Sequence, residues 1–215
     1  MKRQWGFCVF MALLSIPAIA QRRPDVKPTF QGFLFLPVAL GNPVFDNLTA
    51  VLGQVEGSFQ LPVYKGFGVG VGVNATWYEL EEFGLSAQVP TDGDVRRMLY
   101  FGKLNWTRYT GATTFLELST KLGHSTWDWN CRSCSENERQ PGFHWGVNAA
   151  WFIHASDNLA FGLSLGYEQD ARSFSPGVIG LERFPGRTDT GAPYHFLTVG
   201  LGFSTSFQKV KEEGW

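Results

Sequence analysis

The spacing that most directly suggests chemistry in this 215-residue chain is that of two cysteines three positions apart, Cys131 and Cys134. Such a pair can form a local disulfide, supply half of a zinc site or act as a redox couple. Zinc would need two more ligands, and His124 is the only histidine nearby. A redox couple would need a helix N-terminus to lower the pKa of one thiol, and no helical pattern surrounds the pair. We therefore expect a disulfide that tightens a loop, with metal binding and redox activity as the alternatives.

Charged residues of both signs form a second candidate group, because they stand in stretches where polar and apolar residues alternate. If the polar rows face an enclosed interior, their charges must pair or be hydrogen-bonded. We expect a closed polar network there, with an ion path as the alternative. The network would contain Glu56, Lys103, Asn105, Glu117, Lys121 and Asn148, and the same rows include Gln54, Ser58, His144 and Glu168.

Eight segments with period-2 alternation are the elements that must position these side chains. Each is about 10 to 15 residues long, which is longer than the usual soluble strand and long enough for a tilted strand to cross a bilayer. The clearest reads GFGVGVGVNATWY at 66–78, with glycine or polar residues on one face and bulky apolar residues on the other. The predicted strands are 30–39, 49–61, 66–79, 96–109, 112–124, 142–154, 158–169 and 193–207.

The connections between these segments alternate in length. Three are tight turns, whereas the loops at 40–48, 80–95, 125–141 and 170–192 are longer and richer in charge, Pro and Gly. Apolar residues of the last loop are expected to be exposed. Short turns at one end and long loops at the other are typical of membrane barrels. The predicted fold is all-β, an eight-stranded antiparallel up-and-down transmembrane β-barrel, in which Pro37 should weaken the ladder of the first strand.

The first 20 residues have the layout of a cleavable signal peptide, with a basic start, a short apolar core and the small-x-small site Ala18-Ile19-Ala20. We expect one barrel domain over 21–215, which loses Cys8 together with the signal. Removing Lys2 and Arg3 leaves 16 basic against 19 acidic residues, so no basic excess favours nucleic acid. No feature of the sequence predicts a cofactor.

Period-2 alternation alone does not separate a membrane barrel from a soluble barrel with an apolar interior. Three features favour lipid outside: the many glycines in the polar row, the export signal, and aromatic residues near strand ends. These aromatic residues are Trp77, Tyr78, Tyr100, Trp106, Tyr109, Trp145, Trp151 and Tyr167.

With these features, the chain resembles the small bacterial outer-membrane β-barrel superfamily and is similar in layout to the OmpX, OmpW and OmpA barrel domains. The resemblance rests on the signal peptide, the eight alternating segments, the unequal loops and the glycine-rich closing segment 197–203. It implies a porin-like fold in the outer membrane, in contact with membrane lipids and lipopolysaccharide, and a structural or surface-interaction role. An envelope or extracellular protein partner would bind through the loops.

Some barrels of this kind modify lipid A as deacylases or acyltransferases, which makes an enzyme the second hypothesis. The residues that would match are His124, Ser125 and Glu136. Adjacent strand residues point to opposite faces, however, and the deacylase pattern needs serine where this chain has Thr126. We therefore expect no enzyme, and a narrow channel or apolar-solute conduit remains the third hypothesis.

Overall fold

A computed structural model of the 215-residue chain describes residues 27–80, 93–131, 139–174, 178 and 192–207. The predicted signal peptide lies outside the described residues. The elements are β1 (Thr29–Ala39), α2 (Pro43–Leu48), β2 (Thr49–Tyr64), β3 (Phe67–Leu80), β4 (Gly93–Tyr109), β5 (Thr114–Cys131), β6 (Arg139–His154), β7 (Leu159–Phe174) and β8 (Ala192–Ser206).

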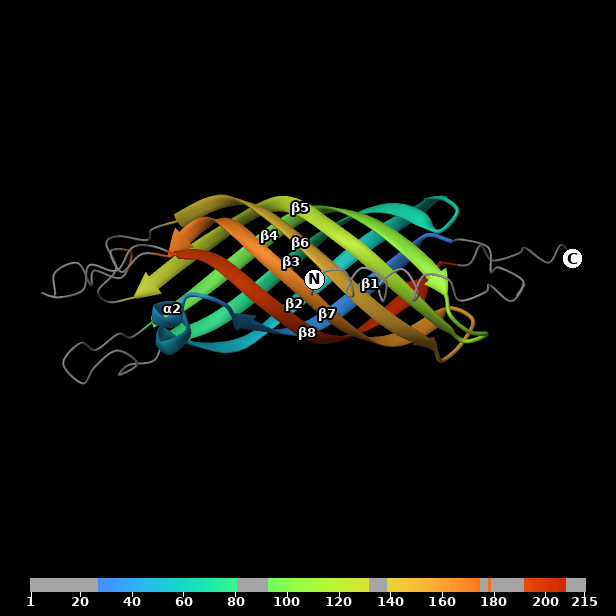
Figure 1. Cartoon of the computed structure of the whole chain (residues 1–215), viewed down its shortest axis with the longest axis horizontal. Coiled ribbons are helices and arrows are strands. Elements are labelled where there is room, and N and C mark those ends of the chain that lie inside the picture. The colour runs from blue at the N-terminus through green and yellow to red at the C-terminus, as the bar shows by residue number, and fades with distance from the viewer. Residues whose placement is uncertain (1–26, 81–92, 132–138, 175–177, 179–191, 208–215) are drawn as a thin grey trace, which may run out of the picture.

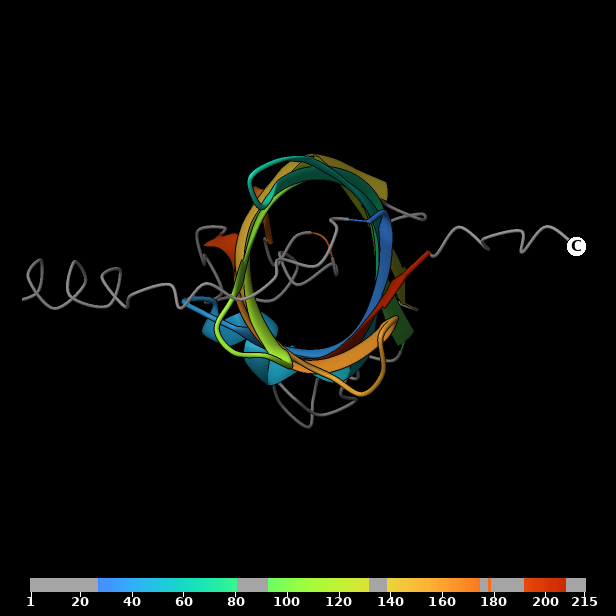
Figure 2. The same ribbon diagram turned by 90° about the vertical axis from the view of Figure 1, so that its right-hand side faces the viewer.

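The eight strands form one closed antiparallel barrel in sequence order, with β1 paired to both β2 and β8 (Figures 1 and 2). The strands tilt across the long axis, as closure of a sheet requires. The short connections β2–β3, β4–β5 and β6–β7 share one end, here called the turn end, and α2 lies at the other, here called the helix end (Figure 1). This confirms the predicted all-β barrel.

Side chains alternate between a polar or aromatic lumen and an apolar exterior. In the stretch 66–78, Val69, Val71 and Val73 are exposed, whereas Asn74 and Thr76 are buried inside. Exposed Leu, Val and Phe side chains continue around the other strands. An exterior this apolar around a lumen that holds charges suits hydrocarbon rather than water. The predicted direction of each row is therefore confirmed.

Most strands are longer than predicted, and β5 and β7 extend furthest beyond their predicted ends. β5 continues to Cys131 and β7 to Phe174, so residues 125–131 and 170–174 belong to strands of the sheet rather than to loops. As a result, Trp127, Trp129 and Phe174 point into the lumen and are buried. The expectation that Phe174 lies exposed in a loop was wrong, because alternation continues past the apolar belt.

Helix α2 occupies the segment that the sequence predicted as a loop at 40–48. Asn42 caps it by accepting a hydrogen bond from the backbone N–H of Phe45 at 3.1 Å, and a proline stands in its first turn. Thr49 closes the other end by donating to the carbonyl of Phe45 at 2.8 Å. Both caps are local and polar, so the helix begins and ends within a connection of a few residues. Among the described residues, no helix is long and apolar enough to cross a membrane.

Strand β1 pairs unequally with its two neighbours. Its register with β8 runs from Thr29 to Ala39, but its register with β2 stops at Phe35. Pro37 follows two residues later and has no N–H to donate to a ladder. The predicted weakening at Pro37 therefore falls on the β2 side.

Phenylalanine rings fill the space beside several of the inward-facing glycines. A Cβ added at Gly200 would collide with the ring of Phe35, and one added at Gly202 would collide with Phe33, its cross-strand partner. Gly162 stands in the same relation to Phe152. These three glycines are thus matched by large rings, which occupy the space that the missing side chains leave in the described part of the lumen.

Candidate functional site

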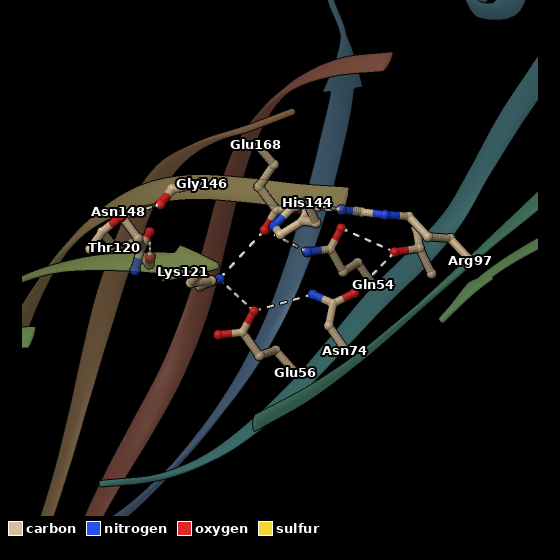
Figure 3. A network of polar contacts seen from close by, with 12 residues as sticks. Gln54, Glu56, Asn74, Arg97, Thr120, Lys121, His144, Gly146, Asn148 and Glu168 are labelled. Carbon is tan, nitrogen blue, oxygen red and sulfur yellow. Dashed lines mark hydrogen bonds and ion pairs between the residues drawn. The ribbon is translucent and has the colours of Figure 1, made fainter. Parts of the chain in front are cut away.

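The middle of the lumen holds a polar network centred on Lys121 of β5 (Figure 3). The Lys121 ammonium pairs with Glu56 of β2 and lies 3.4 Å from Glu168 of β7, which joins three strands across the barrel. Asn74 donates to Glu56 at 3.2 Å, and Gln54 donates to Glu168 at 3.5 Å. All five side chains are buried.

Toward the helix end, Arg97 of β4 continues the network. Its guanidinium lies 2.9 Å from Glu168 and 3.1 Å from Asp170. His144 Nδ1 is 2.7 Å from Asp170 and 2.9 Å from the Arg97 Nη2. The Trp127 indole donates to Asp170 at 2.9 Å. Glu168 therefore links the lysine and the arginine.

Toward the turn end, Lys103 forms a separate cluster. Its ammonium lies 2.8 Å from Glu117 and donates to Gln31 at 2.7 Å. Gln31 and Gln60 both donate to Glu117, at 2.8 and 3.1 Å. Each buried charge here has a partner of opposite sign or an amide, as the desolvation cost demands.

The predicted lumen residues all lie inside, but they do not form one network. Glu56 and Lys121 belong to the central cluster, whereas Lys103 and Glu117 belong to the other. Asn105 and Asn148 lie apart from both: Asn105 contacts Thr107 at 3.5 Å, and Asn148 accepts from Ser164 at 2.6 Å.

Three main partners were missed from the sequence. Asp170 falls just beyond the predicted end of its strand, and Gln31 stands in the strand whose alternation was least regular. Arg97 shares the odd-numbered row of Lys103 and could have been found from it, but apolar residues at 99 and 101 hide the polar character of that row.

At the helix end, the lumen is closed by rings, here called the aromatic cage. Its walls are Tyr78 of β3, Trp127 and Trp129 of β5, Phe174 of β7, and Tyr194 and Phe196 of β8. Phe45 of α2 stands among them, with ring centroids 5.4 to 6.2 Å from all six and interplanar angles of 70 to 89°. Tyr78 was predicted among the strand-end aromatic residues, and it points inward. The cage, the two charge clusters and a second apolar cluster with Phe33, Phe35, Phe115 and Phe152 all lie in the described lumen.

The residues of the enzyme hypothesis do not assemble. His124 is exposed on the outer face and Ser125 is buried on the inner face, as strand geometry requires. Glu136 lies outside the described residues. Inside the lumen, His144 and Asp170 form a histidine–carboxylate pair, yet His144 Nε2 has no hydrogen-bond partner among the described side chains. A nucleophile activated by this histidine is therefore lacking in that part of the chain.

The cysteine pair is only partly described. Cys131 ends β5, and Cys134 lies outside the described residues, so the disulfide stays a prediction. In the described ranges, no group of three or more His, Cys, Asp or Glu side chains is arranged to hold a metal ion.

Comparisons with known proteins give relatives in structure alone. No family model matches the chain, and no curated protein matches it significantly. Among solved structures, Neisserial surface protein A is 11% identical, with 84% of this chain and 97% of that chain covered and a TM-score of 0.53. OprG from Pseudomonas aeruginosa is 11% identical over 86% and 97%, with a TM-score of 0.52. A major outer membrane protein from Thermus thermophilus is 12% identical over 84% and 99%, with a TM-score of 0.54.

These likenesses cover nearly the whole of each solved chain at very low identity, so they bear on the fold and not on the role. Together with the closed eight-strand sheet and its apolar exterior, they lead to one conclusion. The chain has the fold of the small outer-membrane β-barrels.

Proposed function

We propose that this protein is an integral protein of the bacterial outer membrane with a sealed lumen, which acts at the cell surface in a structural or binding role. One observation carries the proposal: ion pairs and the aromatic cage occupy the lumen from the Lys103 cluster to the helix end. An eight-strand barrel has room for side chains and little else. The predicted signal peptide supports export, and the helix end would then face outward.

Planar-bilayer recording tests the seal. We expect the purified protein to give no conductance steps under conditions in which a general porin conducts, because each buried charge is held by a partner rather than by water. Regular steps of porin size would contradict the sealed lumen and revive the channel hypothesis.

Lipopolysaccharide is the binding partner that the described surface supports best. A hollow of about 380 Å³ at the helix end of β6 and β7 is lined by Arg139 and Arg172 among other residues. Arg139 is paired with the exposed Asp128 at 2.9 Å, and Arg172 donates to the carbonyl of Pro141 at 2.7 Å. Guanidinium groups suit phosphate because their donors can engage it in pairs.

Replacing Arg139 and Arg172 together by alanine should reduce retention of lipopolysaccharide through purification, measured by phosphate and fatty-acid analysis. Lys65→Ala at the turn end is the matched control, since it removes a cation from the opposite rim. Equal retention by all three proteins would show that the two arginines do not hold this lipid. We assign no enzymatic activity, because His124 and Ser125 face opposite sides of the barrel wall.

A further inference from the structure

Phe45 is the one ring of the aromatic cage that does not come from the barrel wall. It is carried by α2, a helix of six residues, and it makes edge-on contacts with the six wall rings. Edge-to-face geometry is a preferred arrangement for aromatic pairs. The cage is therefore shaped to hold an aromatic ring that comes from outside the wall.

The walls of the cage carry polar atoms that Phe45 leaves unused. The hydroxyl of Tyr78 is buried and has no hydrogen-bond partner among the described residues. The Trp129 indole is directed at the buried Tyr194 hydroxyl, whose own proton has no acceptor among the described residues. Native structures rarely leave such atoms unpaired. A phenyl ring has no atom to offer them, so Phe45 fits the cage in shape and not in hydrogen bonding.

The attachment of α2 permits its ring to leave without opening the barrel. The wall closes through strand pairing alone, and α2 takes no part in that sheet. Two hydrogen bonds of Asn42, to the N–H of Phe45 and to the carbonyl of Ala192 at 3.3 Å, anchor the start of the helix. Before it, Gly41 has a φ of 70°, a conformation that glycine adopts easily.

We propose that the aromatic cage is a binding site for a small planar aromatic molecule that carries a hydroxyl or carbonyl oxygen, and that Phe45 occupies the site until such a ligand displaces it. The oxygen is required because the hydroxyls of Tyr78 and Tyr194 each have a proton to donate, and only an acceptor atom can receive it. A phenol satisfies these groups and presents a ring of the same size as Phe45. The cage lies inside the barrel and involves no contact with lipopolysaccharide, so the proposal stands apart from the surface role.

Titration of the full mature chain in detergent micelles with 4-ethylphenol tests the proposal, with ethylbenzene as the matched probe that lacks the oxygen. The readout is the NMR signal of the Leu48 methyl groups, since Leu48 lies on α2 and is fully buried against the cage. We expect 4-ethylphenol to bind with a saturable shift of Leu48, and ethylbenzene to bind more weakly. Binding without any change at Leu48 would overturn the displacement of α2.

Variants separate the cage from its occupant. Phe45→Ala should bind 4-ethylphenol about 10-fold more tightly than the natural chain, because the ligand no longer competes with the ring. Phe45→Leu, which keeps most of the packing, should show the same direction of change. Tyr78→Phe combined with Tyr194→Phe should remove the preference for 4-ethylphenol over ethylbenzene.

Phe152→Ala is the matched control, since Phe152 is a buried ring that packs with Phe33, Phe35 and Phe115 and does not line the cage. It should leave the Leu48 titration unchanged. Binding to the Phe45 variants but not to the natural chain would overturn the proposal, because Phe45 would then be a permanent part of the wall. Equal affinity for the two probes in the natural chain would overturn the role of the polar atoms.

Discussion

Lys121 shows how much a single lumen side chain can hold together. Its ammonium joins Glu56 on one side of the barrel to Glu168 on another, and Glu168 in turn pairs with Arg97. The alternation of polar and apolar residues was enough to predict that Glu56 and Lys121 face inward. Which charges meet across the lumen depends on strand tilt and stagger, which a single sequence does not reveal.

Lys121→Met should lower the free energy of unfolding by about 3 to 5 kcal/mol. The change leaves the buried Glu56 without a cation and removes one of the two cations that pair with Glu168. The measurement is urea unfolding in lipid vesicles, followed by tryptophan fluorescence. Lys65→Met, at the exposed β2–β3 turn, is the control and should change stability by less than about 0.5 kcal/mol. Equal effects of the two changes would mean that the buried pair contributes nothing specific.

Gly200→Ala should destabilise the barrel by about 1 to 3 kcal/mol, since the new methyl group meets both the Phe35 ring and the Leu34 carbonyl. Gly102→Ala offers the matched comparison: it points outward, and the nearest atom to its added Cβ is 3.8 Å away. The same unfolding assay should find Gly102→Ala close to neutral. If both variants behaved alike, the ring-over-glycine packing would not be tight in solution.

At the scale of elements, the sequence prediction missed the helix and the full length of several strands. A run of six residues is too short to show a helical period, and its stability comes from packing of Phe45 and Leu48 rather than from propensity. The capping asparagine followed by proline was a usable signal. The extra length of β5 and β7 was missed for a different reason, because the membrane-crossing length accounts only for residues within the apolar belt.

Asn42→Ala should loosen α2 by about 1 kcal/mol, the usual cost of losing an N-cap. Amide hydrogen exchange of Phe45 should then speed up by about 5-fold, because this N–H is the donor to Asn42. Asn47→Ala, an exposed position on the same helix, should leave the exchange rate unchanged. Similar rates in both variants would indicate that the cap does not hold the helix.

At the scale of the whole molecule, the direction of the two side-chain rows decides which medium surrounds the barrel. Trp151 is 49% exposed on the outer face, whereas Trp127 is fully buried in the cage. Sequence periodicity predicted the rows but could not separate a membrane barrel from its soluble counterpart. The charges in the lumen and the apolar exterior now make that distinction.

Brominated phospholipids test the orientation directly. In variants that keep a single tryptophan, fluorescence of Trp151 should be strongly quenched by bromine on the acyl chains, and fluorescence of Trp127 should not. Vesicles of the same lipid without bromine provide the reference. Quenching of Trp127 but not Trp151 would turn the barrel inside out, with the apolar row around an interior cavity.

The bonds that cross the lumen also bear on the order of events during assembly. Gln31 and Glu117 are 86 residues apart, Lys121 and Glu56 are 65 apart, and the seam joins Thr29 to Ser206. Before that seam forms there is no enclosed interior, so a lone hairpin entering hydrocarbon would expose its inward charges to lipid. Ring closure and dehydration of the charges must therefore occur together, which makes assembly a single late, cooperative and slow step rather than the addition of one strand after another.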